Sequence, residues 1–463
     1  MDHSLLLDKD LIARYDRLGP RYTSYPTAMQ FHEGFRGEQF LENVRLSNEF
    51  PIPSPLSLYF HLPFCSKVCF YCACNRIITN NRAHTVPYLE HLKQEIALQA
   101  RLFDQDREVR QLHWGGGTPT YFNHEQMQDL MLATRRHFNL VDDEEGDFSI
   151  EVDPRTTDAG TIALLRGIGF NRISLGVQDV NPAVQKAVNR IQPMEQTLEV
   201  VQAAREQGYK SLSMDLIYGL PLQTVQSFSQ TLDTVIAMNP DRLSVFNFAH
   251  MPQRFKMQRR IKKDDLPSAA EKLDMLANII DTLTDAGYVY IGMDHFARPD
   301  DELALAQEEG TMCRNFQGYS THGDCDIIAM GITSISKVSD CYAQNVYELD
   351  EYGSLVENGQ LPVFRGLRLD RDDLVRQDVI MKLICDFKVD FETIEDRHRI
   401  NFEEYFYNEL ELLKGMEEDG LLKRDLECIS ISPSGRLLIR NICGIFDKYL
   451  RQEQNQNRYS KVI

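Results

Sequence analysis

The chain has 463 residues, 43% hydrophobic and 26% charged, which is typical of a globular protein with one large α/β domain and a smaller one. Its formal charge of −19 argues against broad nucleic-acid binding. We find no signal-peptide pattern and no run near the ~20 apolar residues of a membrane span. Ten cysteines without an export signal indicate reduced thiols, so we expect a cytoplasmic protein.

Short β-branched, apolar runs alternate with amphipathic stretches from about residue 57 to residue 247. The predicted strands are Ser57–His61, Arg110–Trp114, Phe148–Val152, Arg172–Val177, Ser211–Leu216 and Arg242–Phe246. The predicted helices are Val86–Phe103, Glu125–Phe138, Thr161–Gly167, Pro182–Gln207 and Thr224–Met238. This alternation is typical of right-handed βαβ units and a parallel sheet. Six units predict an α/β fold with a partial (β/α)6 barrel, because a closed barrel needs eight.

The pattern changes after about residue 368. The C-terminal part contains two helical stretches, a hairpin-like segment and a last helix, which are Asp372–Phe387, Phe402–Asp419, Leu421–Ser432 and Arg436–Leu450. This order predicts a small, mostly helical domain of the winged-helix type. We therefore divide the chain into an N-terminal arm (1–50), a catalytic barrel (51–368) and a C-terminal helical domain (369–463).

The strongest chemical signal is a cysteine motif after the first predicted strand, with Cys65, Cys69 and Cys72 spaced as C-x₃-C-x₂-C. A [4Fe–4S] cluster held by three cysteines keeps one iron open for a small molecule. A zinc site is the alternative, but zinc motifs bring two cysteine pairs and no second pair follows here. Cys74, two residues beyond the motif, is either a group that tunes the cluster or a bystander thiol.

Further polar residues and glycines stand where predicted strands end, which is where parallel α/β folds bind ligands. Gly115–Gly117 follows one strand, Glu151 and Asp215 close two others, and Gln178 follows a fourth. Glycine backbone can approach a ligand closely, although a plain turn would look the same. A buried carboxylate needs a partner, which is either a ligand or an arginine.

Seven further segments stand in a characteristic order: Gly19–Ala28, Leu112–Thr120, Ser149–Pro154, Gly176–Asp179, Asp215–Pro221, Gly292–Pro299 and Arg314–Tyr319. Together with the cysteine motif they resemble the radical S-adenosylmethionine (SAM) superfamily. Within it, the chain resembles the oxygen-independent coproporphyrinogen III oxidases over nearly its whole length. A haem-chaperone branch of the same family is the close alternative. That branch lacks the arm Arg21–Pro26 and the extra cysteine, Cys74, both present here.

The resemblance implies a radical SAM oxidoreductase of haem (porphyrin) biosynthesis. Cys65, Cys69 and Cys72 would hold the cluster, and SAM on the open iron would give a 5′-deoxyadenosyl radical. This radical would start the oxidative decarboxylation of two propionates of coproporphyrinogen III, yielding the vinyl groups of protoporphyrinogen IX. Two SAM molecules would match the two decarboxylations. The implied partners are an electron donor such as flavodoxin or ferredoxin and an unnamed terminal electron acceptor, and a monomer would suffice.

The resemblance also assigns roles to single residues. Tyr59, His61 and Glu151 would be catalytic. The SAM contacts would be Tyr59, Tyr71, Gly116, Gly117, Thr118, Glu151, Gln178, Arg190, Asp215 and Ala249, with Gln317 and Ile335 beside the second SAM. Read without the resemblance, Tyr59 and His61 are alternating strand residues, Ala249 and Ile335 are ordinary core, and Arg190 fits a surface ion pair on a helix.

The implied substrate carries four carboxylates, so we expect arginines to face it. The candidates are Arg21, Arg298 and Arg314, and Tyr22 and Tyr25 on the N-terminal arm could cover bound substrate. The main alternative function is that of a haem-binding carrier without decarboxylase activity. A radical SAM enzyme acting on an RNA base fits poorly with the acidic charge. The alternative that the sequence favours least is a zinc-stabilised structural protein.

Overall fold

The computed structural model describes residues 5–15 and 19–451. The chain forms two compact units. The sheet unit comprises Phe31–Ser268 and Asp324–Arg368. The terminal unit comprises the described residues of Met1–Gln30, Ala269–Gly323 and Leu369–Ile463. Within the described part of the chain, no helix combines the length and the apolar character needed to cross a membrane.

The sheet unit is built on strands in the order β9-β8-β7-β6-β4-β1-β14-β15-β16-β17, with β5 paired to β4. Neighbouring strands are parallel from β9 to β14 and antiparallel from β14 to β17. Their bounds are β1 Leu56–Leu62, β4 Glu108–Gly116, β5 Asn139–Leu140, β6 Asp147–Val152, β7 Arg172–Gln178, β8 Ser211–Tyr218, β9 Arg242–Asn247, β14 Asp326–Met330, β15 Ile335–Val338, β16 Cys341–Asn345 and β17 Val363–Arg368.

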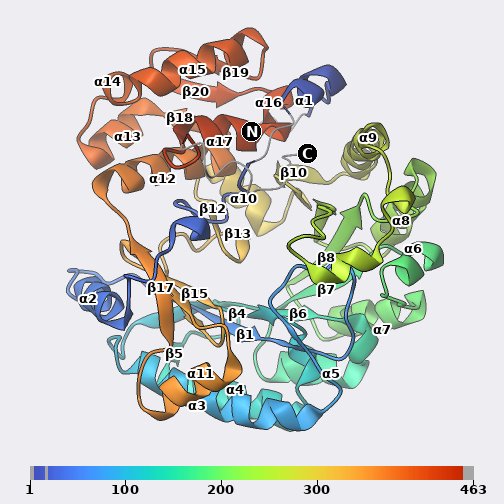
Figure 1. Cartoon of the computed structure of the whole chain (residues 1–463), viewed down its shortest axis with the longest axis vertical. Helices are drawn as coiled ribbons and strands as arrows, with labels where there is room; N and C mark the ends of the chain where they lie inside the picture. Colours follow the sequence, from blue (N-terminus) through green and yellow to red (C-terminus); the bar gives the residue numbers. More distant parts are fainter. Residues whose placement is uncertain (1–4, 16–18, 452–463) are drawn as a thin grey trace. The chain divides into compact units, whose positions relative to one another are not determined.

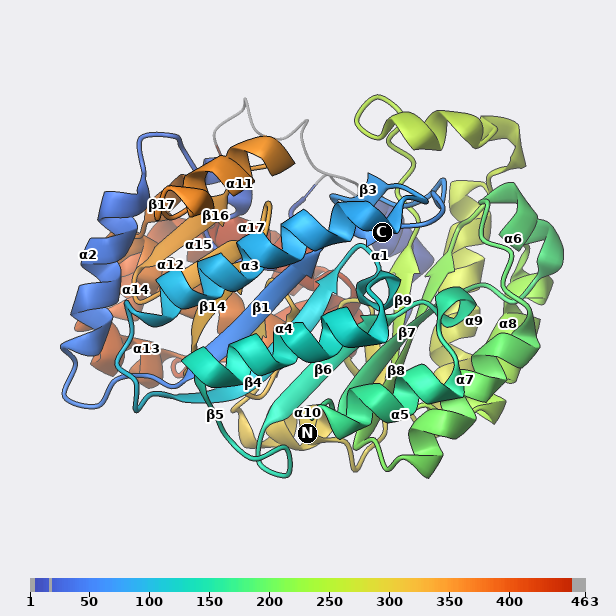
Figure 2. The ribbon, with the colours of Figure 1, turned by 90° about the horizontal axis from the view of Figure 1, so that it is seen from below.

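The six predicted parallel strands are confirmed, and β9 and β17 do not pair with each other, so the sheet is not a closed barrel. Helices pack along one face of this sheet (Figure 2). They are α3 Thr85–Ala100, α4 His124–His137, α5 Ala159–Gly167 and α7 Met194–Glu206. Residues next to a helix cap its N-terminus: at the start of α4, the side chain of Asn123 accepts a hydrogen bond from the backbone amide of Gln126. The buried side chains of α3, including Leu92 and Ile96, form its core stripe.

One predicted helix is wrong. Pro182–Gln207 forms two helices, α6 (Pro182–Ala187) and α7, because Asn189 adopts a left-handed φ of 56° and Pro193 stands just before α7. Arg190 therefore lies in the connection between the helices and is buried, rather than on a helix surface. This irregular connection is what allows the guanidinium of Arg190 to turn toward the strand ends.

The sequence also missed the antiparallel extension β14–β17. The pairing of β1 with β14 brings together residues as distant in the chain as Leu56 and Asp326, and no local sequence pattern indicates such pairing. The remaining elements of this unit are α2 Gly37–Asn48, β2 Phe64–Cys65, β3 Ile77–Ile78, η2 Arg82–His84, η3 Pro119–Tyr121, η4 Pro154–Thr156, α8 Val225–Ala237, η5 Lys256–Arg260, η6 Lys263–Asp265 and α11 Leu349–Glu357.

The terminal unit joins segments from both ends of the chain and from its middle. The first segments contain α1 Lys9–Tyr15, η1 Ala28–Gln30, α9 Ala269–Asp285, β10 Val289–Gly292, β11 His295–Ala297, α10 Glu302–Glu309, β12 Cys313–Asn315 and β13 Gly318–Ser320. The C-terminal segment contains α12 Arg371–Asp386, β18 Lys388–Asp390, α13 Phe391–His398, α14 Phe402–Tyr405, α15 Tyr407–Glu418, β19 Leu422–Arg424, β20 Cys428–Ile431, α16 Pro433–Leu437 and α17 Ile439–Phe446 (Figure 1).

The predicted C-terminal helical domain is confirmed in outline, including the hairpin of β19 and β20. Two details are wrong. The helix predicted over Phe402–Asp419 is interrupted at Phe406, and the last helix is shorter than Arg436–Leu450 because α16 and α17 divide at Leu438. β18, which the sequence did not reveal, adds a third strand beside β20. The proposed domain boundaries at residues 50 and 368 stay a prediction.

Candidate active site

The cysteine motif lies on a loop between β2 and β3, directly after β1. Cys65 ends β2, while Cys69 and Cys72 lie within the loop. The α6–α7 connection supports the loop: the side-chain amide of Asn189 donates to Val68 O at 2.6 Å. The amide of Phe70 donates to Val188 O at 2.9 Å. Both hydrogen bonds fix the main chain of the loop that carries the thiols.

The thiols of Cys65 and Cys72 differ in pKa. Burial raises the pKa of Cys65 to about 11, and its Sγ lies 3.2 Å from Thr118 Oγ1. The pKa of Cys72 falls to about 6, chiefly because Cys74 hydrogen-bonds to it, with help from the Arg76 charge. The same hydrogen bond raises the pKa of Cys74. The role of Cys74, either a group that tunes the cluster or a bystander thiol, stays a prediction.

Two arginines face the third sulfur. Arg155 Nη2 lies 3.6 Å and Arg190 Nη1 3.7 Å from Cys69 Sγ. Asp153 binds both: its Oδ2 is 2.6 Å from Arg155 Nη2 and 3.3 Å from Arg190 Nη1. Burial opposes ionisation of Asp153, but the charges of Arg190 and Arg155 outweigh it and lower its pKa. Arg190 also donates to Gly176 O at 2.5 Å, so its orientation is set from two sides.

This arrangement fits an iron–sulfur cluster. Cys65, Cys69 and Cys72 are free cysteines, and cysteine thiolates are the ligands that hold a [4Fe–4S] cluster. Arg155 Nη1 and Arg190 Nε are buried without a hydrogen-bond partner. Unpaired cationic donors beside a thiol suit a larger group that carries negative charge. The residues present therefore fit a cluster with three cysteine ligands and an anionic ligand beside it.

Neighbouring groups pack closely against the three glycines. A Cβ on Gly116, whose φ is 109°, would lie 2.6 Å from the ring of His61. A Cβ on Gly117 would lie 2.5 Å from the carbonyl carbon of Pro63. A Cβ on Gly115 would lie 3.0 Å from the Glu151 carboxylate. Gly116 and Gly117 thus leave no room for a side chain, whereas at Gly115 the ends of the His113 and Glu151 side chains would have to shift. The predicted SAM contacts of Gly116, Gly117 and Thr118 stay predictions.

Tyr59 and His61 lie on β1, and Glu151 lies near the end of β6. Tyr59 OH lies 3.2 Å from His61 Nδ1, and His61 Nε2 lies 3.0 Å from Asn75 O. The Asn75 carbonyl requires a proton on Nε2, so Nδ1 accepts from Tyr59. Burial lowers the pKa of His61, which favours this neutral form. The structure brings together the residues that the resemblance marks as catalytic.

Glu151 is held in the ionised form. Gly116 N donates to its Oε2 at 3.1 Å, and His113 Nε2 lies 3.5 Å from its Oε1. Burial opposes ionisation of Glu151, but the bonds to His113 and Gly116 outweigh it, so its pKa is lowered. His113 also stacks on Tyr59, with ring centroids 5.8 Å apart. His113, which the sequence analysis did not single out, thus links Glu151 to Tyr59.

The pKa of Asp215 is raised, whereas that of Glu151 is lowered. Burial and the charge of Glu151 raise its pKa to about 6, and its contacts are hydroxyl groups such as Ser174 Oγ at 3.4 Å. Gln178 lies on the next strand, at an irregularity in the β7–β8 pairing, with a left-handed φ of 70°. Such strain concentrates at functional positions. Both residues lie toward the carboxyl ends of their strands, as the sequence predicts.

Tyr71 and Ala249 are connected by a residue that the sequence did not reveal. Gln258, 1% exposed, donates through Nε2 to Tyr71 O at 3.2 Å and to Ala249 O at 3.3 Å. The amide of Met251 donates back to Gln258 Oε1. Tyr71 also packs on the apolar cluster that includes Val188. Gln258 therefore connects the cysteine loop to the segment after β9.

The other predicted positions lie elsewhere. Gln317 belongs to the terminal unit, between β12 and β13, and Ile335 begins β15 in the sheet unit. The substrate candidates Arg21, Arg298 and Arg314 belong to the terminal unit, as do Tyr22 and Tyr25, which are buried. The predicted pairing of Gln317 and Ile335 at a second SAM stays a prediction.

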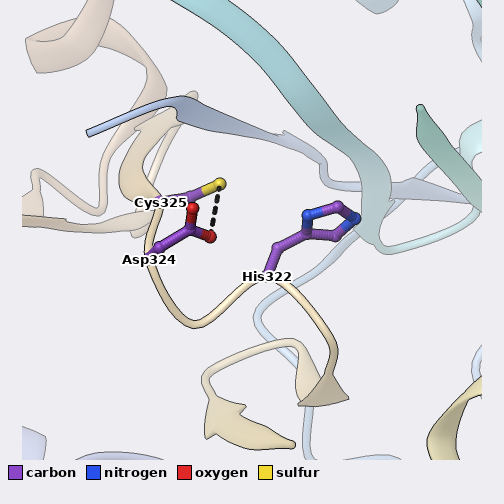
Figure 3. A group of neighbouring side chains, drawn as sticks. All are labelled: His322, Asp324 and Cys325. Carbon is purple, nitrogen blue, oxygen red and sulfur yellow. Dashed lines mark hydrogen bonds between the residues drawn. The ribbon is translucent and has the colours of Figure 1, made fainter. Parts of the chain in front are cut away.

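The segment between β13 and β14 carries His322, Asp324 and Cys325 (Figure 3). Cys325 Sγ lies 3.8 Å from Asp324 Oδ1. We assign no metal to these residues, because His322 belongs to the terminal unit and the other two to the sheet unit.

Comparisons with known proteins identify the family of the chain. The Radical SAM superfamily model matches residues 59–235, and the HemN C-terminal domain model matches residues 369–438. The chain is 53% identical over 456 residues to the oxygen-independent coproporphyrinogen III oxidase of Pseudomonas aeruginosa, covering 98% of each. It belongs to the oxygen-independent coproporphyrinogen III oxidase family. The E. coli family member is 50% identical over 98% of both chains.

A solved structure supports the same membership. Coproporphyrinogen III oxidase (HemN) from Escherichia coli, described as a radical SAM enzyme, matches with a TM-score of 0.92 and 49% identity over 96% of this chain and 100% of that chain. The family and fold predictions are therefore confirmed, as is the assignment to radical SAM oxidoreductases with a [4Fe–4S] cluster and SAM. The haem-carrier alternative finds no support among these relatives.

Proposed function

We propose that the chain catalyses the oxygen-independent oxidative decarboxylation of two propionate side chains of coproporphyrinogen III, giving protoporphyrinogen IX. Each propionate loses one hydrogen atom, one CO₂ and one electron and becomes a vinyl group. The observation that best supports this is the cysteine loop with Arg155 and Arg190 fixed on Cys69 by Asp153. It is a site for an iron–sulfur cluster beside an anionic ligand, at the strand ends where parallel folds bind substrates.

Cys65, Cys69 and Cys72 would hold the cluster. When bound, the cluster and SAM supply an electron and a carbon-centred radical that can remove hydrogen from an unactivated carbon. Arg190 Nε, buried and unpaired, is available to an anionic part of the ligand. Asp215, with its pKa raised to about 6 by burial, gains from a ligand that brings a cation or hydroxyl groups.

Tyr59, His61 and Glu151 would position the reacting groups. The proton on His61 Nε2 is committed to Asn75 O, so the Tyr59 hydroxyl is directed at His61 Nδ1. Glu151 accepts from the Gly116 amide and keeps lone pairs for hydroxyl or ammonium donors of a ligand. Because these groups are already oriented, ligand binding would need little reorganisation of the strand ends.

We further propose that two SAM molecules take part, with Gln317 and Ile335 contacting the second. The electron donor would be a small redox protein such as a flavodoxin or ferredoxin, and a separate oxidant would accept the final electron. We also propose a monomeric state, because the predicted cofactor ligands all come from one chain. The proposed location is the cytoplasm.

The proposal is tested by reconstituting the purified chain with iron and sulfide without oxygen. Reductant, SAM, coproporphyrinogen III and an extract that lacks this activity, as acceptor source, are then added, and tetrapyrroles are followed by mass spectrometry. We expect stepwise loss of two CO₂ units, abolished in Cys69→Ser and retained in Cys325→Ser, a cysteine outside the motif. Formation of 5′-deoxyadenosine without a tetrapyrrole mass change would show that the substrate is wrong. Tight haem binding without either product would favour a carrier.

A further inference from the structure

Two stretches of the chain carry positive charge and no acidic residue, although the whole chain has a formal charge of −19. The first is 50–89, which contains the cysteine motif, and the second is 242–263. We call the last part of the second stretch, 253–263, the basic segment. Its basic residues are Arg254, Lys256, Arg259, Arg260, Lys262 and Lys263. Positive charge is thus concentrated in two places of an otherwise acidic chain.

The structure places these two stretches side by side in the sheet unit. The Cζ of Arg260 lies over the ring of Phe70, 5.4 Å from its centroid. Gln258 Nε2 donates to Tyr71 O at 3.2 Å. Ile261 belongs to the apolar cluster against which Phe70 and Tyr71 pack. The basic segment therefore packs directly against the loop that carries the motif thiols.

The charges of the basic segment lie at the surface. All six of its basic residues are exposed, and so is Lys67, which stands between Cys65 and Cys69 in the cysteine loop. Arg259 Nε donates to Pro252 O at 3.0 Å, but within the described part of the chain no carboxylate pairs with any of the six. Surface charge that the fold does not neutralise is available to a partner of opposite charge.

Basic residues elsewhere in the same unit show the contrast. Lys93 Nζ lies 2.7 Å from Asp129 Oδ2, and Arg205 Nη1 lies 2.8 Å from Asp241 Oδ2. Single cations there are neutralised by carboxylates of the same chain. The basic segment instead holds six cations together without such pairs. This arrangement is slightly unfavourable for the isolated protein, because like charges repel, and favourable for a complex with a negatively charged partner.

The position of the basic segment beside the cysteine loop decides which kind of partner fits it. The proposed reaction consumes electrons that must reach the cluster held by this loop, and electron transfer slows steeply with distance. A protein that donates these electrons must therefore dock on the loop or next to it. A negatively charged donor would be repelled by a protein with a net charge of −19, unless a local positive surface attracts it. The basic segment provides that surface where the electron has to enter.

We propose that the basic segment and Lys67 form the docking surface for an acidic redox protein that delivers single electrons to the cluster. In each transfer the reduced centre of the donor loses one electron and the oxidised cluster gains it, and no bond is formed or broken. This inference rests on the proposed function, which requires an electron donor. Opposite charges would steer and orient the two proteins, as in the small, weak interfaces typical of electron-transfer complexes.

The test measures binding of an acidic flavodoxin to the reconstituted full-length protein without oxygen. A fluorescently labelled, oxidised flavodoxin is titrated by anisotropy at low and at high ionic strength. Lys256→Glu combined with Lys262→Glu reverses two charges of the basic segment at exposed residues. We expect this lysine variant to bind with a Kd about tenfold or more above that of the wild type at low salt. The difference should shrink at high salt, because ions screen exposed charges.

A matched control reverses two charges at the opposite ends of the strands. Arg101 follows α3, whose 16 residues extend about 24 Å, and Arg136 lies in the last turn of α4. Both helices lead into the start of a strand, so these two exposed arginines lie toward the amino ends of the sheet, whereas the cysteine loop follows the carboxyl end of β1. Arg101→Glu combined with Arg136→Glu changes the net charge by the same amount. Its Kd for flavodoxin should stay within about twofold of the wild type, because distant charges are screened.

Stopped-flow absorbance gives a second readout. Fully reduced flavodoxin is mixed with the oxidised, cluster-loaded protein, and its one-electron oxidation is followed. The lysine variant should accept electrons about tenfold more slowly than the wild type at low salt, because electrostatic steering is lost. Dithionite is a small reductant that needs no docking surface. It should reduce the cluster of all three proteins to the same extent by electron paramagnetic resonance, which excludes a loss of folding or of the cluster.

Three results would overturn the proposal. The first is that flavodoxin does not bind the wild type, or that it binds and reduces the lysine variant equally well. The second is that the arginine control loses as much affinity as the lysine variant, because binding would then depend on net charge alone. The third is that the lysine variant keeps flavodoxin binding and loses affinity for an RNA oligonucleotide or for coproporphyrin III, the stable oxidised tetrapyrrole. The basic segment would then serve that ligand instead.

The proposed function fails or stands separately. If the wild type decarboxylates coproporphyrinogen III with dithionite as the reductant under any of these three results, the proposed function stands and only the docking surface fails. If flavodoxin reduces the wild type through the basic segment, yet neither reductant supports decarboxylation of coproporphyrinogen III, the docking surface stands and the proposed function fails.

Discussion

The two units orient buried arginine side chains in different ways. In the sheet unit, Asp153 pairs with both Arg155 and Arg190, and the two guanidinium groups meet Cys69 Sγ with their direction already set. In the terminal unit, Arg314 stacks on Tyr319, 4.5 Å from the ring centroid, and its Nε and Nη1 are buried without a hydrogen-bond partner. A carboxylate therefore sets the direction of the guanidinium groups in the first unit, and an aromatic ring sets it in the second.

The largest effect should come from removing the balancing carboxylate in the sheet unit. Asp153→Asn leaves two buried guanidinium groups without an opposite charge, which is expected to lower the free energy of unfolding by about 3–5 kcal/mol. Denaturant unfolding of the metal-free protein measures this. Asp241→Asn, which removes the partner of the part-exposed Arg205, is the control and should cost about 1 kcal/mol or less. Equal losses in the two variants would contradict the idea that Asp153 neutralises the site.

A smaller effect concerns Asp215, which lacks the arginine pairing of Asp153. Its pKa is raised from 3.8 to about 6, so the fold favours the protonated form. The stability that this provides is present below the unfolded pKa and is lost as the pH rises through about 6. Relative to Asp215→Asn, the ligand-free wild type should lose about 1–3 kcal/mol between pH ~4 and pH ~7. Unfolding free energies of both proteins at the two pH values measure this, and a constant difference would refute it.

The terminal unit provides a weaker ion pair for comparison. Asp294→Asn removes the carboxylate that pairs with Arg21. The Arg21–Asp294 pair is partly exposed, with 36% and 22% of the side chains accessible. Its loss should therefore lower the free energy of unfolding by about 1 kcal/mol or less. Denaturant unfolding measures this, and a loss as large as that of Asp153→Asn would contradict the expected difference.

The smallest effect should come from Arg155→Lys. Lysine keeps the charge near Cys69 but loses the planar fork that binds Asp153 and the sulfur together. Fewer N–H···S contacts disfavour the more negative, reduced cluster, so its reduction potential should fall by roughly tens of millivolts. A redox titration followed by electron paramagnetic resonance measures the shift. Arg205→Lys is the control, and a rise in potential for Arg155→Lys would contradict the assigned role.

Much of the site could be predicted because its signals are local. The C-x₃-C-x₂-C spacing and the alternation of strands with helices are properties of short segments. Once parallel strands are expected, Glu151 and Asp215 fall at the same edge of the sheet. For Gly115–Gly117, the sequence predicted close approach of a ligand. The structure adds that His61 and Pro63 themselves leave no room for a side chain at Gly116 and Gly117.

Other features depended on contacts that no local pattern reports. The amphipathic pattern ran on through Asn189, whose left-handed φ breaks the helix and turns Arg190 inward. Gln258 donates to the carbonyl of Tyr71, 187 residues earlier in the chain, and also to that of Ala249.

The sequence by itself therefore determined the parallel strands and the cysteine motif, since spacing and periodicity act within a few residues, and the order of its motifs indicated the family. Tertiary structure alone decided which carboxylate pairs with which arginine. Asp153 pairs with two arginines at one site, while Arg314 stacks on Tyr319 at another. Charge balance is a property of neighbours in space, and those neighbours come from distant parts of the chain.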